Sequence, residues 1–170
     1  MVRFKNRYVL CQVVAEEPRG RSCIEERAVG SAVKDAIARA YGDYGLACCS
    51  LAFTVKYLNA YTGTVLLRCR KDFYRLLCSA LPLVRQLESR GLRCPCFLST
   101  LHVGGTIRSC QKFLIQYNRR QLLTLLQNCT NEEERQRIRQ SVLSCSLTEE
   151  QSHSGEEEEE EDEDDGTETD

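Results

Sequence analysis

Hydrophobic and polar residues alternate most clearly around a predicted β-hairpin in the first half of the chain. The segment 46–58 ends in β-branched and aromatic residues, and residues 59–63 contain Asn, Thr and Gly, which favour a turn. In the following strand, 64–70, every second residue is hydrophobic: Val65, Leu67 and Cys69. The pattern therefore predicts a strand with one face in a core, while the other face presents Arg68 and Arg70.

The remaining periodicities predict two more strands and four helices. In chain order these are a strand over residues 3–14, helices over 24–41 and 72–90, a strand over 96–103, and helices over 111–128 and 130–147. Pro82 lies inside the second helix and is expected to break or kink it near Leu81. Thr130 and Glu133 have the spacing of a capping box, which favours a helix start at that point.

The order strand, helix, strand, strand, helix, strand is that of the split βαβ, or ferredoxin-like, plan. We therefore predict an α+β fold in which two helices cover one face of an antiparallel sheet and extra helices follow at the C-terminal side. The folded domain is expected to span residues 1–148. Residues 149–170 are expected to form a disordered acidic tail, because they lack hydrophobic residues for a core and their charges repel.

The net charge of -2 hides two parts of opposite character. Residues 156–170 hold 12 of the 25 acidic residues and no Lys or Arg, so residues 1–155 carry 13 acids against 23 bases, a net of +10. A basic body favours polyanionic partners, although a merely solubilising surface is the alternative. In the tail, Ser154 precedes Glu156 and Glu157 with the spacing of an acidophilic kinase target, and an unmodified solubilising tail is the alternative.

The 11 cysteines are expected to be reduced and buried rather than paired in disulfides. Their number is odd, the N-terminus shows no signal-peptide pattern, and several fall where a small hydrophobic residue belongs. The latter are Cys11, Cys69, Cys78, Cys110 and Cys129. A zinc site is not expected, because the pairs Cys48-Cys49 and Cys94-Pro95-Cys96 lack the usual Cys-x2-Cys spacing. No hydrophobic run approaches the roughly 20 residues of a membrane span.

No group of residues predicts catalysis. His102 is the only histidine of the predicted domain and lies within a strand, so a structural role is expected rather than partnership with a nucleophilic thiol. Glu132, Glu133 and Glu134 fall in a predicted first helical turn, where the helix dipole accounts for them. The segment 102–108 lacks the residues of a P-loop or a dinucleotide fingerprint, so its two glycines are interpreted as bend positions.

Nucleic-acid binding has more support. Arg68, Arg70 and Lys71 end one predicted strand, Arg108 and Lys112 follow another, and the split βαβ plan brings both strands into one sheet. Three aromatic residues nearby are candidates for base stacking or for core packing: Tyr57, Tyr61 and Phe73. The strand 64–71 has no stacking rings at its exposed positions, so the pattern favours recognition of backbone and shape.

Three long motifs resemble one known family. They are the N-terminal Met-Val-Arg-Phe-Lys, the hairpin Lys-Tyr-Leu-Asn-Ala-Tyr-Thr-Gly with Val-Leu-Leu-Arg-Cys-Arg-Lys, and Thr-Leu-His-Val-Gly-Gly-Thr-Ile-Arg with the helix Cys-Gln-Lys-Phe-Leu-Ile-Gln-Tyr-Asn-Arg-Arg. In this order they resemble the fifth "processing of precursors" protein subunit shared by ribonuclease P and ribonuclease MRP. The resemblance extends from Met1 to about Cys129.

The resemblance implies an RNA-recognition-like fold and a noncatalytic subunit that binds and stabilises a catalytic RNA. That RNA, with its own Mg²⁺, would mature the 5′ end of precursor tRNA, and the second particle would process ribosomal RNA precursors. The chain itself would bind no cofactor and no metal. Implied partners are the two RNAs, a TIM-barrel-like subunit and a related small subunit, and the implied location is the nucleus and nucleolus. The implied RNA contacts are the bases within the motifs: Lys56, Arg68, Arg70, Lys71, Arg108, Lys112, Arg119 and Arg120.

Two hypotheses of other classes remain. A protein scaffold within the particle would make little direct contact with RNA. A protein-only ribonuclease would need a cluster of carboxylates on the sheet, which the sequence does not show.

Overall fold

The computed structural model describes residues 4–16 and 23–153. It separates into two compact units, and each is considered by itself. Unit 1 is Met1–Cys110 and unit 2 is Gln111–Asp170.

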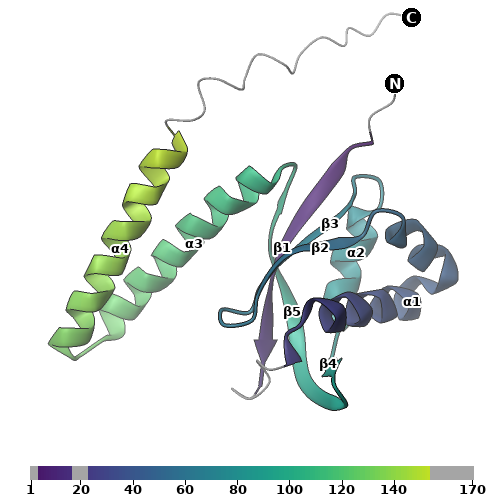
Figure 1. Ribbon diagram of the computed structural model, residues 1–170, viewed down its shortest axis with the longest axis horizontal. Helices are drawn as coiled ribbons and strands as arrows, with labels where there is room; N and C mark the ends of the chain where they lie inside the picture. The colour runs from purple at the N-terminus through teal and green to yellow at the C-terminus, as the bar shows by residue number, and fades with distance from the viewer. Residues whose placement is uncertain (1–3, 17–22, 154–170) are drawn as a thin grey trace, which may run out of the picture. The chain divides into compact units, whose positions relative to one another are not determined.

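Unit 1 contains a five-stranded antiparallel sheet in the order β2-β3-β1-β5-β4 (Figure 1). The strands are β1 (Asn6–Ala15), β2 (Thr54–Asn59), β3 (Thr64–Arg70), β4 (Gln86–Ser89) and β5 (Leu92–Gly104). The first strand is central and has β3 on one side and β5 on the other. The strands β2, β3, β1 and β5 form the predicted split βαβ sheet, and the predicted α+β fold is confirmed.

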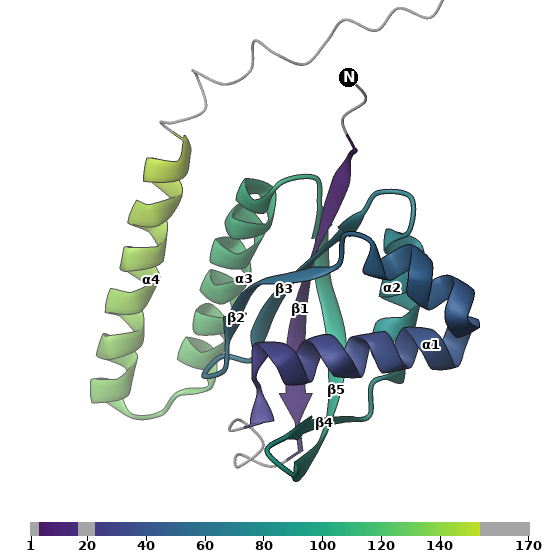
Figure 2. The same cartoon turned by 45° about the vertical axis from the view of Figure 1, so that its right-hand side comes forward.

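Two helices, α1 (Glu26–Ser50) and α2 (Tyr74–Ala80), pack against each other beside the sheet (Figure 2). Alternate residues of β1 and β3 point into the core that these helices close, as the period of two requires. Fully buried members of this core are Val9, Cys11, Val29, Val33, Val65, Leu67 and Leu77. One face of the sheet is thus covered by helices, as expected.

The sequence between α2 and β5 departs from the prediction. The helix expected over residues 72–90 ends at Ala80, and a 3-10 turn follows over Leu81–Leu83 with Pro82 inside it. Proline lacks the N–H that a continuing helix needs, so the chain turns there and forms β4, which the sequence analysis did not predict. The hairpin turn to β5 places both Arg90 and Gly91 at positive φ, 51° and 78°.

The first helix is longer than expected. Residues 46–50, predicted as the start of a strand, belong to α1, and β2 begins only at Thr54. Gly42 marks the predicted helix end and has the non-helical φ of 65°, but helical structure resumes beyond it. The glycine therefore kinks the helix instead of ending it.

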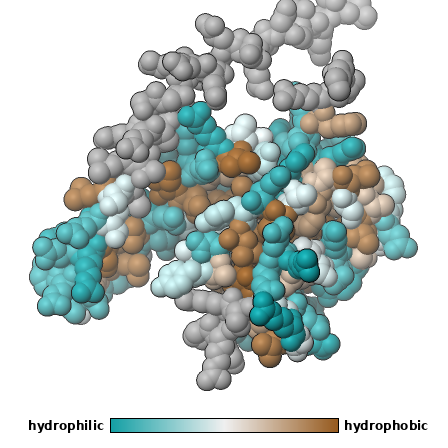
Figure 3. Space-filling view, in the orientation of Figure 1, coloured by the Kyte–Doolittle hydropathy of each residue, from teal (hydrophilic) through white to brown (hydrophobic). Residues whose placement is uncertain are grey.

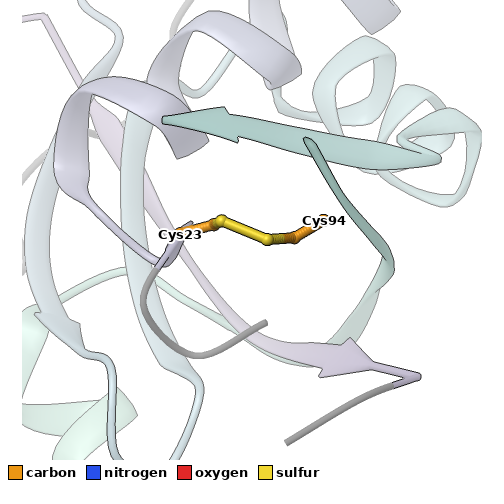
Figure 4. Close-up of a disulfide and its surroundings, with 2 residues drawn as sticks. All are labelled: Cys23 and Cys94. Carbon is orange, nitrogen blue, oxygen red and sulfur yellow. A yellow bond between two sulfur atoms is a disulfide. The ribbon is translucent and has the colours of Figure 1, made fainter. Parts of the chain in front are cut away.

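A disulfide joins Cys23 and Cys94, which corrects the expectation that all cysteines are reduced (Figure 4). The two residues are 71 positions apart in sequence, and neither belongs to a recognisable spacing motif, so only the fold brings them together. Cys23 precedes α1 and Cys94 lies in β5 where it pairs with β4. The five cysteines expected to be buried on hydrophobic faces are all free thiols. Cys11, Cys69 and Cys110 are buried as expected, whereas Cys78 and Cys129 are only partly buried.

Unit 2 contains most of α3 (Ile107–Asn128) and all of α4 (Glu132–His153). The rings of Phe113 and Tyr117 stack one turn apart on α3, with centroids 6.1 Å apart. The side chain of Asn131, and not that of Thr130, caps α4 by accepting a hydrogen bond from the Glu133 N–H at 3.2 Å. Residues 149–153 of the predicted tail continue α4, and the rest of that tail, including Ser154, lies outside the described residues.

None of the helices in the described part of the chain combines the length and hydrophobicity needed to cross a membrane.

Candidate nucleic-acid interface

The sheet register brings the predicted basic segments together at one end of unit 1. Tyr8 pairs with Arg68 of β3 on one side and with Gly104 of β5 on the other. The C-terminal ends of β3 and β5 therefore flank the start of β1, although these segments are far apart in sequence. In this register, Arg68 and Arg108 extend from the same end of one sheet.

Six basic residues gather at this position, which we call the basic sheet end. Three come from β3 and its continuation, two from the start of the chain, and one from the first turn of α3; they are Lys5, Arg7, Arg68, Arg70, Lys71 and Arg108. The Lys71 N–H donates to the Lys5 carbonyl at 3.0 Å, so the backbones of these two exposed residues are adjacent. The Arg70 guanidinium lies 4.1 Å from the centroid of the exposed Phe4 ring.

Lys5 and Arg7 were not among the predicted RNA-binding residues. Arg3, Lys5 and Arg7 alternate in the sequence, and this spacing is typical of one face of a strand. Their link to Arg68 and Arg70 depends on the β1–β3 pairing, which no local pattern reveals. A Cβ atom added to Gly105 would lie 3.4 Å from Arg7 Nη1, so this guanidinium lies against the turn that leads into α3.

Five of the six basic residues of the basic sheet end have no ion-pair partner within the described residues: Lys5, Arg7, Arg68, Arg70 and Lys71. In addition, Arg68 Nε is buried and has no hydrogen-bond partner among those residues. The side chains lie on both faces of the sheet, because Arg7 pairs with the core residue Cys69 whereas Arg68 and Arg70 lie on the opposite face. An anion at this sheet end would be attracted by the unneutralised cations.

The other predicted contact residues belong to β2 or to unit 2. Lys56 is exposed at the register shift of β2, where Val55 pairs with Leu67 and Tyr57 with Leu66. Lys112, Arg119 and Arg120 belong to α3 within unit 2, and Arg120 is exposed. Only Arg68, Arg70, Lys71 and Arg108 of the eight predicted residues thus share the basic sheet end.

The aromatic candidates divide into two groups. The side chains of Tyr57 and Tyr61 are 48% and 80% exposed, whereas Phe73 packs against the core.

The two faces of β3 differ less in exposure than the alternation of hydrophobic and polar residues predicts. Leu66 and Thr64, on the face opposite the core residues, are only 5% and 7% exposed, so Arg68 and Arg70 provide the accessible part of that face. Hydrophilic and hydrophobic residues are likewise interspersed over the surface shown in Figure 3.

The buried thiols are poorly suited to nucleophilic chemistry. Burial raises the pKa of Cys69 to about 12, and burial likewise raises the pKa values of the Cys11, Cys96 and Cys110 thiols. A thiol becomes a nucleophile only as the thiolate, which these environments disfavour. Among the described residues, no group of three or more His, Cys, Asp or Glu side chains is arranged to hold a metal ion.

The sequence is similar to a defined set of known proteins. It is 64% identical over 152 residues to the "Ribonuclease P/MRP protein subunit POP5" of Bos taurus, which covers 89% of each chain. It is 62% identical over 156 residues to the protein of the same name from Homo sapiens, covering 92% of this chain and 96% of that one.

Among solved structures, a chain in the "Cryo-EM structure of yeast Ribonuclease MRP" matches with a TM-score of 0.47 and 12% sequence identity, over 62% of this chain and 78% of that chain. The model of the Rpp14/Pop5 family matches residues 7–115, which include most of the basic sheet end and all of the sheet except Asn6. Together with the identity to the mammalian proteins over nearly their full length, this match shows that the chain belongs to the Rpp14/Pop5 family.

Proposed function

We propose that this chain is a noncatalytic protein subunit of ribonuclease P and ribonuclease MRP that binds and stabilises their RNA components. The proposal that it is a subunit rests on its membership of the family and on the names of its relatives. The proposal that it binds RNA directly rests on the basic sheet end. Its work in the particles would be the 5′ maturation of precursor tRNA and the processing of ribosomal RNA precursors.

The observation that carries direct RNA binding is the grouping of unpaired cations at one end of the sheet. Arg68, Arg70 and Lys71 lie beside Lys5 and Arg7, and none of these five has an ion-pair partner among the described residues. A phosphodiester backbone that folds closely on itself provides the matching array of negative charges. Because the strand presents arginines where stacking rings would lie, these contacts would read phosphate positions rather than base identity.

Catalysis would belong to the RNA and not to this chain. The raised pKa values of the buried thiols support a noncatalytic role, and we infer that the catalytic Mg²⁺ is held by the RNA. We further propose that the protein partners include a TIM-barrel-like subunit and a related small subunit, and that the assembly resides in the nucleus and nucleolus.

Replacing Arg68, Arg70 and Lys71 together with Ala tests the proposed RNA interface. Three fewer phosphate contacts should weaken RNA binding and reduce the slope of log K against log salt by roughly 2 to 3. The measurement is binding of the catalytic RNA to the purified full chain over a series of salt concentrations. Circular dichroism of the variant should show an unchanged fold, since all three side chains are at least partly exposed.

The matched control removes three exposed bases that lie outside the basic sheet end: Arg27, Lys34 and Arg85. It changes the net charge by the same amount, so a long-range charge effect would lower the slope equally in both variants. If both variants lost the same RNA affinity and the same salt slope, the assignment of the interface to the basic sheet end would be wrong.

Two other experiments separate this function from its alternatives. Crosslinking in the assembled particle should join RNA to the region of Arg68 and Arg108, whereas a pure scaffold would give no protein–RNA crosslinks there. Incubation of precursor tRNA with the purified chain and Mg²⁺, without the catalytic RNA, should give no cleavage. Metal-dependent cleavage would instead show a protein-only ribonuclease.

A further inference from the structure

Part of the sheet edge next to β4 is left without a neighbouring strand. β4 pairs only with residues 92–95 of β5, and the last backbone bond on that side joins Cys96 N to the Arg85 carbonyl at 3.0 Å. Beyond Cys96, β5 pairs with β1 alone, and within the described residues no strand lies on its other side. The second half of this 13-residue strand therefore has no strand paired to it on that side, where the 3-10 turn Leu81–Leu83 packs against β5 without backbone hydrogen bonds to Leu98, Thr100 or Val103.

The direction of the free backbone groups follows from two bonds at the start of this segment. The Cys96 N–H points to the β4 side, whereas the Pro95 carbonyl accepts from the Glu16 N–H on the β1 side, at 3.4 Å. Because these directions alternate along a strand, Leu98 and Thr100 direct their N–H and C=O groups away from β1. Beyond the register shift between Leu10 and Cys11, Val103 pairs with Val9 and likewise directs its N–H and C=O groups away from β1. We call the backbone of Leu98, Thr100 and Val103 the open edge.

A groove of about 690 Å³ runs between the open edge and α2. Tyr74, Cys78 and Pro82 line one wall, while Leu98 and Val103 line the other. Thr100 shares the face of the fully buried Leu98 but is exposed, so the cover that α2 gives to the core stops short of this part of β5. An added strand would therefore find both backbone partners and nonpolar side-chain contacts.

The other two exposed strands carry features that discourage pairing with a further strand. β2 has the exposed Lys56 at its register shift, and β4 is only four residues long with Gln86 and Glu88 exposed. Lysine at the edge, bulges and short strands are the usual protection of sheet edges. The segment 97–103 has no Lys, Arg, Asp, Glu or Pro, so the register shift opposite Leu10 and Cys11 is the only one of these features that it carries.

We propose that the open edge binds an extended segment of another protein as an additional β-strand. The segment would be hydrophobic at every second residue, to fill the groove, and would have acidic residues at its ends. Charge favours such a segment, because unit 1 contains 17 Lys and Arg against 8 Asp and Glu, and the exposed Arg75 lines the groove. A second copy of this chain would bring the same excess of positive charge to the contact. The proposal is independent of RNA binding by the basic sheet end.

Amide hydrogen exchange on the full chain tests the proposal with a defined probe. The probe is a blocked peptide of alternating Val and Thr with two Glu at each end, and its counterpart carries Lys in place of Glu. At a concentration ten times its dissociation constant, the Glu peptide should slow exchange of the Leu98, Thr100 and Val103 amides by roughly tenfold. The amides of β4 should be unchanged, and the Lys peptide should bind more weakly.

Two matched variants place the same charge at different exposed edge positions. Thr100→Glu puts a negative charge in the groove and should weaken binding of the Glu peptide by about tenfold, whereas Gln86→Glu on β4 should not. Absence of protection at the open edge, equal weakening by both variants, or equal binding of the Lys peptide would overturn the proposal. So would light scattering that shows a dimer whose open edge is already protected without peptide, because the occupant would then be a second copy.

Discussion

Gly63 joins the β2–β3 hairpin to the central strand. Its φ is 71°, and its carbonyl accepts a hydrogen bond from the Val13 N–H at 2.7 Å. A Cβ atom at this position would lie 2.6 Å from the Val13 carbonyl oxygen. The predicted turn is thus confirmed over residues 60–63, while Asn59 ends β2. The sequence could not reveal that Gly63 also contacts a strand about 50 positions earlier.

Gly63→Ala should destabilise unit 1 by roughly 2 to 4 kcal/mol, because it combines a positive φ with a steric clash against the backbone. The measurement is the free energy of unfolding in urea. Gly91→Ala is the matched control, since its φ is 78° but a Cβ there meets nothing within 4 Å. If the two variants lost equal stability, close approach to Val13 would have no energetic role.

The buried thiols make stability depend on alkaline pH. Burial raises the pKa of Cys69 from 9.0 to about 12 and also raises that of Cys11. In the unfolded chain these thiols ionise near their ordinary pKa, so above about pH 9 the unfolded state binds fewer protons than the folded state and is favoured. The contribution of these protonated thiols to the free energy of unfolding is therefore fully present below pH 9 and is lost as the pH rises toward 12.

The melting temperature should accordingly fall between pH 9 and 11, with each buried thiol contributing up to about 1.4 kcal/mol per pH unit. Calorimetry of the wild type and of Cys69→Ala over this range checks the prediction. The variant should be less stable at pH 7 but should lose less stability on going to pH 11. Parallel pH profiles would contradict the role of this thiol.

At the scale of elements, the sequence predicts well whether a segment is a helix or a strand, but it predicts poorly where each helix or strand begins and ends. β3 is found over the predicted residues 64–70 because its alternation is regular and both its ends carry charge or turn residues. β4 was missed because only Leu87 and Ser89 are buried in it, too short a pattern to distinguish from a helix that continues past Pro82. The Cys23–Cys94 disulfide was missed for a different reason, since proximity over 71 positions is a property of the fold.

For the interface, the strand pattern and the family resemblance predicted Arg68, Arg70, Lys71 and Arg108 but not Lys5 and Arg7. The latter join the basic sheet end only through the pairing of β1 with β3, which is a long-range contact. The sequence does not predict the open edge of β5 either, because this edge depends on the residue at which the pairing of β4 with β5 ends.

At the scale of the whole chain, the dominant property is the separation of charge. Residues 156–170 hold 12 acidic residues, while the remaining 155 residues carry 23 bases against 13 acids. An acidic segment tethered to a basic body competes with other polyanions for that body, and salt screens the competition.

Deleting residues 156–170 should leave the melting temperature within about 2 °C of the wild type, because the segment has no hydrophobic residues to bury. RNA binding should become tighter at low salt, with the difference vanishing at high salt. Replacing every acid of the segment by its amide is the matched control and should reproduce the tighter binding. A large fall in the melting temperature would show that the segment is part of the folded structure.

The central place of β1 in the sheet has a consequence for synthesis. The strand emerges first from the ribosome, yet its neighbours are β3 at residues 64–70 and β5 at residues 92–104. Until both have been translated, a strand with Val9, Leu10, Cys11 and Val13 has unpaired backbone and uncovered side chains. A nascent chain of about 60 residues therefore exposes a ready template for aggregation, and its protection during that interval falls to chaperones or to the speed of elongation.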